Sequence, residues 1–350
     1  MINSVSIYNC KLFERLENVP LSKVTLIGGK NNTGKTTFLE TLFFYSDCKY
    51  PEVLDKLFAW RGFNGFWEPK EVFTKYFNNS ALTKEIKISV NSDGGVKKQL
   101  TINYLNEYKT SAQIPVTENG ITTFKNIFPA FEIKHSSNNS VDYQAYILCH
   151  EKAKNYIKEA DSLQIQIPVF YMGEGMQIYE KNVEYLGILD KADEQEKILP
   201  FLKLFEPNLI RLQLINDGGN NVIYADCGNK KKIPVNMLGY GFCRCLTMAL
   251  ILAAENTKLF LIDEVGSGIH YSVQHDLWKF LLKAAEWNDC QIIATAHSLD
   301  TIKAFNEAIK GTSESDFSYI RLGRSNDIIK SYVFEPEILN HSLSSELEVR

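Results

Sequence analysis

A stretch of small and polar residues near the start of the chain has the residue types and spacing of a phosphate-binding loop. It reads GGKNNTGKTTFLE from Gly28 to Glu40, and its central part matches the pattern G-x-x-x-x-G-K-[ST]. In such loops successive N–H groups point at a phosphate, while the lysine reaches the β- and γ-phosphates and the hydroxyl binds Mg²⁺. The sequence therefore predicts a nucleoside triphosphate site. Its expected binding residues are Gly29, Asn31, Asn32, Thr33, Gly34, Lys35, Thr36 and Thr37, with Thr36 also a metal ligand.

An acidic pair follows an apolar segment much later in the chain. The segment KLFLIDEVGSGIH, 258–270, is an expected strand that ends in Asp263-Glu264. Asp263 could hold Mg²⁺, directly or through water, as in nucleotidases that pair a phosphate loop with a second acidic strand. Glu264 would then face the γ-phosphate and act as general base on the attacking water. A plain surface pair at a strand end is the alternative, and the phosphate loop favours the catalytic interpretation.

Two further features complete the candidate set. His297, in QIIATAHSLD, ends the next expected strand, where it could contact the γ-phosphate and sense hydrolysis; a lone histidine is otherwise usually an ordinary polar residue. Gly239 and Gly241, in NMLGYGFCRCLTMALIL, directly precede a long apolar helix, a second candidate anion-binding helix start. Two such starts are most simply explained by a head-to-tail dimer, in which the two loops of different subunits enclose one nucleotide. A turn between a strand and a helix is the alternative.

The elements that must position these residues alternate between strands and helices. We expect strands at 5–8 and 24–27 and a helix from 36, followed at about 50–180 by mostly antiparallel strands. That region has a hairpin around Asp93-Gly94-Gly95 and a helix in EKAKNYIKEA, 151–160. From 192 onward the alternation predicts a parallel sheet. Its expected elements are helices at 192–205, 241–255, 270–285 and 298–308, and strands at 209–215, 222–226, 258–262 and 291–295.

Composition excludes several classes of protein. The 350 residues are 45% hydrophobic and 23% charged with a net charge of −4, so no overall basic field calls for nucleic acid. An 18-residue apolar run and a secretory signal are both lacking, and the seven scattered cysteines do not form a disulfide framework. We expect a cytoplasmic protein that does not associate with membranes.

In this order the motifs resemble those of the ABC-type ATPases, and within them the soluble branch of RecF, SMC-type and OLD (overcoming lysogenization defect) proteins. The segments GKNNTGKTTFLE, DEVGSGIH, TAHS and the closing ELEVR are similar to those of compact AAA-type, OLD-like bacterial ATPases. The resemblance covers 1–43 and about 184–350. It implies one ABC-type ATPase domain over 1–350, an α/β fold with a mixed β lobe and a mostly parallel core sheet. An antiparallel-β and helical insertion would occupy 50–180, and the lobe with the signature loop, acidic pair and histidine would occupy 181–350.

The same resemblance implies roles for the candidate residues, with ATP and Mg²⁺ as cofactors. Lys35, Glu264 and His297 would be catalytic, the last as a switch, and Asp263 would bind the metal. Gly239 and Gly241 would form the signature loop that acts across a dimer, although glycine and tyrosine replace the serine and first glycine of transporter signatures. This departure argues against a transporter subunit. Arg244, one helical turn further on, is a candidate to replace the serine contact.

The implied function is a slow ATPase that dimerises or oligomerises around ATP and regulates a separate effector. Only 53 residues follow His297, too few for the Toprim nuclease domain of OLD enzymes, so we expect a toxin or nuclease on another, neighbouring chain. Such pairs act in anti-phage defence, as in PARIS-like systems. The alternative is a DNA-repair or DNA-tethering ATPase of the RecF or SMC type. The sequence lacks the long heptad run of SMC arms, and DNA binding stays open.

Overall fold

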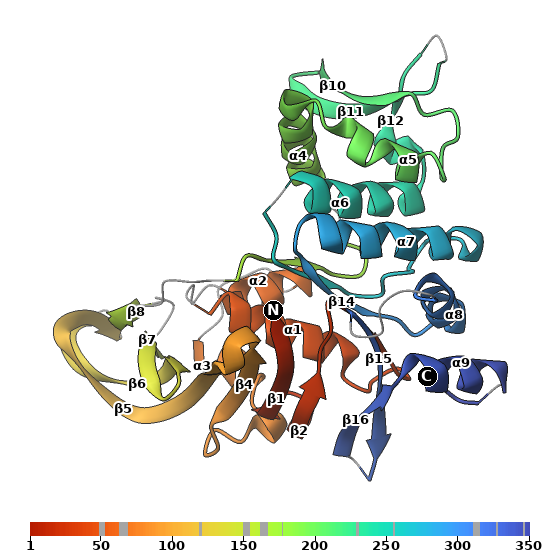
Figure 1. Cartoon of the computed structure of the whole chain (residues 1–350). Coiled ribbons are helices and arrows are strands. Elements are labelled where there is room, and N and C mark those ends of the chain that lie inside the picture. The colour runs from red at the N-terminus through yellow and green to blue at the C-terminus, as the bar shows by residue number, and fades with distance from the viewer. Residues whose placement is uncertain are drawn as a thin grey trace. The chain divides into compact units, whose positions relative to one another are not determined.

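The chain forms two compact units in the computed structural model (Figure 1). The first unit comprises Met1–Leu21, Glu40–Ile167 and Gly323–Ser331, and the second comprises Ser22–Leu39, Pro168–Leu322 and Tyr332–Arg350. The structure describes residues 1–48, 53–62, 69–118, 121–149, 155–161, 167–176, 178–228, 231–254, 256–310, 316–326, 328–345 and 347–350.

The first unit is built on a seven-stranded antiparallel sheet in the order β2-β1-β4-β5-β6-β7-β8. Apolar and polar residues alternate along β4, so one face of the strand is buried. Ile86, Ile88 and Val90 point inward while their neighbours are more exposed. The predicted hairpin after it is confirmed, since Gly94 and Gly95 turn the chain with φ of 78° and 72°. The elements are β1 Ile2–Cys10, β2 Phe13–Pro20, α2 Val53–Trp60, α3 Pro69–Thr74, β4 Ile86–Ser92, β5 Lys97–Glu118, β6 Ile121–Ser137, β7 Ser140–Leu148 and β8 Asn155–Asp161.

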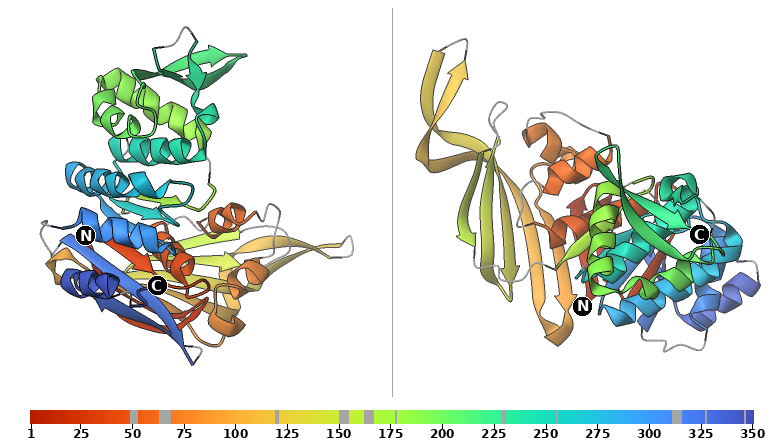
Figure 2. Two further views of the ribbon diagram at one scale, coloured as in Figure 1. Left: turned by 90° about the vertical axis from the view of Figure 1, so that its right-hand side faces the viewer. Right: turned by 90° about the horizontal axis from the view of Figure 1, so that it is seen from above.

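Strands β5 and β6 form a ribbon that extends beyond the neighbouring strands (Figure 2). Pairing of β6 with β7 begins only at Ala130, whereas β6 pairs with β5 back to Ile121. A small buried cluster joins Val116 of β5, Phe128 and Ala130 of β6 and Leu148 of β7. The helix predicted at 151–160 is wrong over the described residues 155–160, which belong to strand β8. Pairing with β7 overrides the helical propensity of this short segment.

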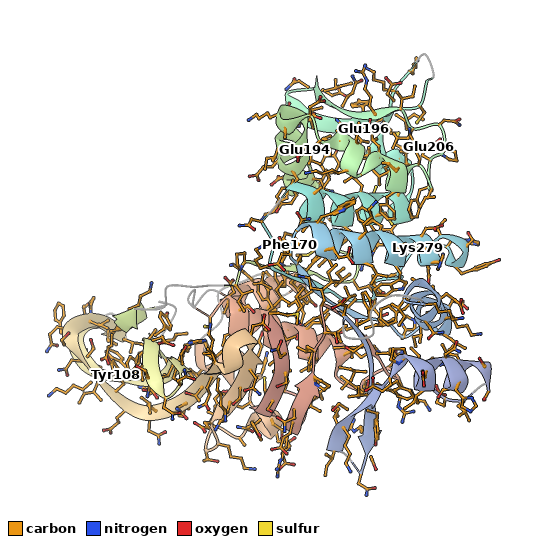
Figure 3. All side chains as sticks on the ribbon, in the orientation of Figure 1. Tyr108, Phe170, Glu194, Glu196, Glu206 and Lys279 are labelled. Carbon is orange, nitrogen blue, oxygen red and sulfur yellow. The ribbon has the colours of Figure 1, made fainter. Side chains whose placement is uncertain are left out.

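The second sheet is mostly parallel and six-stranded, in the order β16-β15-β3-β14-β13-β9, and it belongs to the second unit except for Gly323–Ser331, at the end of β15 and the start of β16. Strands β3, β13 and β14 are buried along their whole length, as expected where a parallel sheet is covered on both faces. Phe170 on β9, labelled in Figure 3, meets the ring of Phe260 on β13 edge-on at a centroid separation of 6.0 Å. The strands are β3 Val24–Gly28, β9 Val169–Met172, β13 Leu259–Ile262, β14 Gln291–Thr295, β15 Phe317–Ser325 and β16 Ile328–Phe334.

Helices and a smaller three-stranded sheet form the rest of the second unit, except that the first of these helices, α1, passes into the first unit at Glu40. The single helix predicted at 192–205 is wrong, because Asp193 takes a left-handed φ of 56° that ends α4 and Pro200 stands at the start of the short α5. The other predicted helices are confirmed to within a few residues. The elements are α1 Lys35–Ser46, α4 Tyr179–Ala192, α5 Leu199–Leu202, β10 Arg211–Asp217, β11 Asn220–Asp226, β12 Ile233–Pro234, α6 Tyr240–Ala254, α7 Tyr271–Trp287, α8 Leu299–Ala308 and α9 Pro336–Ser344.

The expected fold class is confirmed: an α/β protein with a mostly parallel core sheet and a separate antiparallel β region in the first half of the chain. Within the described parts of the chain, we find no helix with both the length and the apolar character needed to cross a membrane.

Candidate nucleotide-binding site

The phosphate loop lies between strand β3 and helix α1, as its motif requires. Gly29 and Gly34 have φ of 145° and 92°, which side-chain-bearing residues rarely adopt, and a Cβ on Gly29 would lie 2.5 Å from the carbonyl oxygen of Leu322. The ammonium Nζ of Lys35 donates to the carbonyl oxygens of Gly29 at 2.9 Å and Lys30 at 3.2 Å. The loop is therefore folded around its own lysine.

The remaining loop residues fall into exposed and buried sets. Asn31 and Asn32 are exposed, and Asn32 has a left-handed φ of 61°. Thr33 and Thr37 are buried, and the hydroxyl of Thr33 donates to the Lys30 carbonyl at 2.8 Å. Thr33 thus braces the loop from inside its turn.

The acidic pair meets the loop because β3, β13 and β14 run parallel and end at one edge of the sheet. Asp263 follows β13, and its Oδ2 accepts a hydrogen bond from Thr36 Oγ1 at 2.9 Å. The two residues predicted to bind the metal, 227 positions apart, are thus direct neighbours.

Glu264 lies at the centre of the cluster. Its Oε2 is 2.7 Å from His297 Nδ1 and accepts from the His297 main-chain N–H at 3.2 Å. Its Oε1 is 3.9 Å from Lys35 Nζ. The structure therefore brings together Lys35, Thr36, Asp263, Glu264 and His297, five residues predicted from three separate motifs.

The side chains of this cluster differ in how far they are exposed to solvent, and burial affects the pKa of Lys35. The Lys35 side chain is 7% exposed and that of Glu264 15%, whereas His297 is 57% exposed. Burial lowers the pKa of Lys35 below its usual value, while the carboxylates of Glu264 and Asp263 act in the opposite direction. One buried cation thus faces two carboxylates.

Thr295 holds the acidic pair in place and was not predicted from the sequence. It is fully buried at the end of β14, donates to Asp263 Oδ1 at 2.6 Å and accepts from the Glu264 main-chain N–H at 2.8 Å. The only available signal was a hydroxyl residue closing an apolar strand directly before Ala296-His297.

The role suggested for Arg244 is wrong. Its side chain is 2% exposed and donates to main-chain carbonyls of its own chain, namely Asp263 at 2.6 Å, Glu264 at 3.0 Å and Gly173 at 3.3 Å. A guanidinium held inside the subunit in this way does not take the place of a serine that contacts a nucleotide on another subunit.

The loop of Gly239, Tyr240 and Gly241 lies beside the segment that follows Glu264. A Cβ on Gly268 would lie 2.2 Å from the Tyr240 ring, and a Cβ on Gly241 would lie 2.5 Å from the Gly268 carbonyl oxygen. The Tyr240 hydroxyl also accepts from the Gly175 N–H at 3.2 Å. Gly239 is exposed at the start of α6 with φ of 100°, so these glycines form a second cluster, next to the acidic pair.

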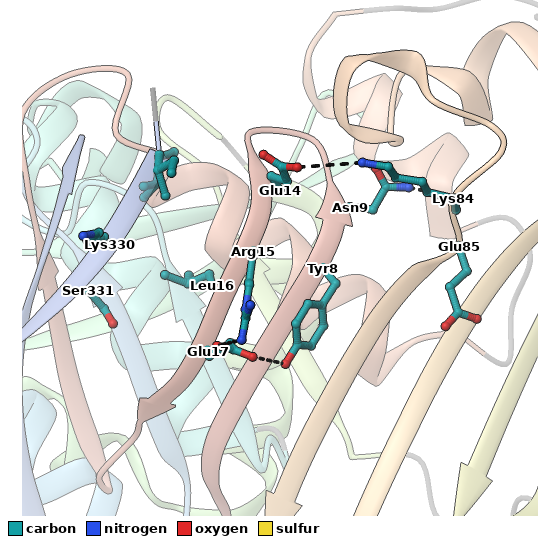
Figure 4. Close-up of a pocket in the computed structure, with 12 residues that line it drawn as sticks. Tyr8, Asn9, Glu14, Arg15, Leu16, Glu17, Lys84, Glu85, Lys330 and Ser331 are labelled. Carbon is teal, nitrogen blue, oxygen red and sulfur yellow. Dashed lines mark hydrogen bonds and ion pairs between the residues drawn. The ribbon is translucent and has the colours of Figure 1, made fainter. Parts of the chain in front are cut away.

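The first unit holds a cavity of about 720 Å³ that contains none of the predicted site residues (Figure 4). Four of the charged residues that line it pair with one another: Glu17 lies 2.7 Å from Arg15, and Lys84 lies 3.8 Å from Glu14. Glu17 also accepts a hydrogen bond from Tyr8 at 2.7 Å.

Comparison with known proteins places the chain in a family. The model described as "AAA domain, putative AbiEii toxin, Type IV TA system" matches residues 24–302, a span that contains every predicted site residue. The chain belongs to this family. It is also similar to an ATP/GTP phosphatase of Helicobacter pylori, with 25% identity over 91% of this chain and 90% of that protein.

Two further similarities are more limited. An uncharacterized protein, MJECL10, of Methanocaldococcus jannaschii is 30% identical over 95 residues, which are 26% of this chain and 41% of that protein. A solved SMC head bound to the C-winged helix domain of ScpA has a TM-score of 0.52 at 11% identity, covering 95% of this chain and 97% of that one. This last likeness shows the fold alone, which is that of an SMC head.

Proposed function

We propose that this protein is a Mg²⁺-dependent ATPase that hydrolyses ATP slowly, associates with itself around the nucleotide and regulates a separate effector protein. The observation that carries the proposal is the convergence of Lys35, Thr36, Asp263, Glu264 and His297 at one sheet edge, described above. The Helicobacter pylori relative, whose name states that it is an ATP/GTP phosphatase, supports hydrolysis of a nucleoside triphosphate.

The residues at the sheet edge fit a magnesium ion bound together with nucleotide phosphates. Thr36 Oγ1 and Asp263 Oδ2 are 2.9 Å apart, close to the roughly 3 Å between adjacent octahedral ligands whose bonds are about 2.1 Å long. The described residues contain no cluster of three or more His, Cys, Asp or Glu side chains able to hold a metal by themselves. Mg²⁺ characteristically takes one or two protein groups and completes its shell with water and phosphate oxygens. When bound, the ion would neutralise charge on the phosphates.

The side chains around that position divide the chemistry between them. Lys35 supplies a fixed positive charge at the phosphates, and the loop N–H groups supply hydrogen bonds. Glu264 is the general base, since its carboxylate can accept a proton from water while the 2.7 Å contact to His297 holds it in place. His297 is more exposed, so it can turn toward a γ-phosphate and report whether that group is present.

The exposed Gly239 loop supports self-association through nucleotide. It starts the 15-residue helix α6, so it offers main-chain N–H groups and a helix dipole to phosphates of a second copy. The solved SMC head is bound to another protein, ScpA, and the family description names a type IV TA system, which has two components; both support a protein partner here. We infer an effector encoded nearby and a role in anti-phage defence, as for OLD-like ATPases of PARIS-like systems.

A second candidate function is DNA repair or DNA tethering of the RecF or SMC type. The SMC-head fold favours it, and the net charge of −4 does not. A mobility-shift assay with duplex DNA at two salt concentrations separates the two. Salt-sensitive, ATP-dependent DNA binding would favour this candidate over the effector model.

The experiment that tests the central proposal measures phosphate release from ATP by wild type, Lys35→Ala and Glu264→Gln. We expect Lys35→Ala to abolish ATP binding, because the loop loses its charge on the phosphates. Glu264→Gln should bind ATP normally, hydrolyse it at least about 100-fold more slowly and accumulate as an ATP-dependent oligomer on a sizing column, since a general base contributes about 10²–10⁴ in rate.

The matched control is Glu196→Gln, which removes an exposed carboxylate in the same unit, labelled in Figure 3. It should release phosphate at the wild-type rate. Hydrolysis by Glu264→Gln at the wild-type rate would show that Glu264 is not the base.

A further inference from the structure

The backbone of Glu264 is held in an unusual conformation. Its φ is 49°, in the left-handed region that a residue with a long side chain adopts only when neighbours over-determine it. Its N–H is fixed by Thr295 and its carbonyl oxygen by Arg244. Hydrogen bonds therefore hold the peptide groups on both sides of the proposed base, one from Thr295 at the end of β14 and the other from Arg244 on α6.

The clamp from α6 has a geometry that only an arginine provides. A single nitrogen, Nη2 of Arg244, donates both to the Asp263 carbonyl and to the Glu264 carbonyl, while Nη1 donates to Gly173 after β9. The planar guanidinium fork presents these donors in fixed directions, whereas a lysine ammonium acts as a compact point charge. Arg244 thus joins α6 to the ends of two adjacent strands, β9 and β13.

The burial of Arg244 costs free energy of folding, so stability alone does not account for it. The guanidinium is nearly fully buried, its acceptors among the described residues are main-chain carbonyls, and its Nε has no hydrogen-bond partner there. Burying a cation without an ionised partner is unfavourable. The benefit lies in fixing Glu264.

Helix α6 also begins in the Gly239–Gly241 loop, so Arg244 stands one turn from it. That loop contacts Gly268, four residues after Glu264. The base is therefore linked to the loop twice, through Arg244 on one side and through Gly268 on the other. A displacement of the loop would therefore act on Glu264 along both links.

We propose that Arg244 is a positioning residue that sets the reactive pose of Glu264 and ties that pose to the Gly239–Gly241 loop. The proposal rests on the ATPase function proposed above and deepens it. Contact of the loop with nucleotide on a second copy would then adjust the base of the loop's own subunit. The two nucleotide sites of an assembly would be coupled through Arg244.

The test compares Arg244→Lys and Arg244→Gln with wild type in steady-state ATP hydrolysis and in binding of a fluorescent ATP analogue. We expect kcat to fall by about 10- to 100-fold in both, the range for misplacing a reactive group by about 1 Å. The analogue's Kd should stay within about threefold, because Lys35 and the loop are untouched. The Hill coefficient for ATP should move toward 1, a change that a merely structural loss of folded protein would not give.

A matched control lies on the same helix. Thr247→Val removes a buried hydrogen bond, accepted from Asn182 Nδ2 at 2.7 Å, that runs to α4 rather than to the acidic pair. Its kcat should stay within about threefold of wild type. In the Glu264→Gln background, Arg244→Lys should cause no further loss of rate, because a residue that acts through Glu264 has nothing left to position.

The outcomes are separable. Wild-type hydrolysis that does not depend on Lys35 would overturn the proposed function itself. Lys35-dependent hydrolysis together with folded Arg244 variants that keep wild-type kcat would overturn only the role of Arg244. Loss of kcat and of analogue binding in parallel would assign Arg244 to general structure and likewise reject the positioning role. If Arg244→Lys does not fold, Arg244→Gln, which keeps a planar donor without the charge, decides the matter.

Discussion

The ammonium group of Lys35 lies between two kinds of oxygen, the carbonyls of its own loop and the carboxylate of Glu264. Because burial lowers its pKa, the free protein releases this proton at a lower pH than an ordinary lysine does. Contact with phosphate favours the charged form and raises the pKa again. ATP binding therefore takes up a proton once the pH exceeds the lowered pKa.

The affinity for ATP should consequently be constant near neutral pH and fall as the pH rises through the lowered pKa of Lys35. The fall should approach about tenfold per pH unit, as linkage requires for one proton. Titration calorimetry between pH 7 and about 11, above the ordinary lysine pKa of about 10.4, measures it. Lys35→Arg, whose charge persists throughout this range, should bind more weakly but with a flat profile. A wild-type affinity that stays constant over the whole range would show that Lys35 does not carry the phosphate contact.

At this scale, the motif residues were predictable and the residues that hold them were not. Lys35, Asp263 and His297 can be recognised in the sequence, because their side chains have the required chemistry and stand at fixed positions relative to predicted strands. Arg244 binds only main-chain carbonyls among the described residues, and Thr295 binds a main-chain N–H as well as the Asp263 carboxylate. Because every residue possesses main-chain groups, contacts of this kind leave no pattern in the sequence. Only the register of β13 with β14 and the pitch of α6 reveal them.

At the scale of the elements, the turn after β13 is closely packed. Gly268 has φ of 72°, and any Cβ there would overlap the ring of Tyr240. Gly268→Ala should therefore lower the free energy of unfolding by about 2–4 kcal/mol, combining backbone strain with overpacking. Urea denaturation followed by fluorescence measures this, and ATP hydrolysis should fall in the same variant.

Gly94 provides the matched control for this prediction. It has a similar φ of 78°, but a Cβ there would meet no atom within 4 Å. Gly94→Ala should cost only the backbone strain, about 1 kcal/mol. Adding Tyr240→Ala to Gly268→Ala should restore part of the lost stability. Equal costs for the two alanine variants would remove the packing argument.

Helices and strands were predicted correctly where the spacing of apolar residues agreed with the turn residues at the ends of the segment. Strands β13 and β14 are uninterrupted apolar runs, and the Asp93-Gly94-Gly95 turn supplies the positive φ its hairpin needs. The prediction was wrong at 155–160, where pairing with β7 decides the conformation of a polar segment. It was also wrong at 192–205, where the apolar spacing is helical but the left-handed φ of Asp193 ends the helix. In both segments non-local contacts or a single φ outweighed the local pattern.

For the whole molecule, the proposed composite site consists of the phosphate loop of one copy and the Gly239–Gly241 loop of another. This arrangement makes a quantitative prediction. Lys35→Ala disables one half of a composite site, and Gly239→Asp places a negative charge in the other half, where a Cβ would meet no atom of its own chain within 4 Å. Each variant alone should be inactive. An equal mixture should recover up to about one quarter of wild-type phosphate release, because half of the dimers are mixed and each has one intact site.

Gly239→Ala is the control, since it shares the backbone strain at φ of 100° without the charge. It should retain more activity than Gly239→Asp. A mixture of Lys35→Ala and Gly239→Asp no more active than its components would argue against a site shared between copies.

The order in which the chain visits its two units has a consequence for signalling. The segment Ser22–Leu39, which carries the phosphate loop, is inserted between Met1–Leu21 and Glu40–Ile167 of the first unit, and helix α1 begins in one unit and ends in the other. If this segment shifts when phosphate binds, covalent bonds at Leu21–Ser22 and Leu39–Glu40 carry the shift to the first unit at two points. Such a connection would need no contact between side chains, so substitutions of surface residues alone would not remove it.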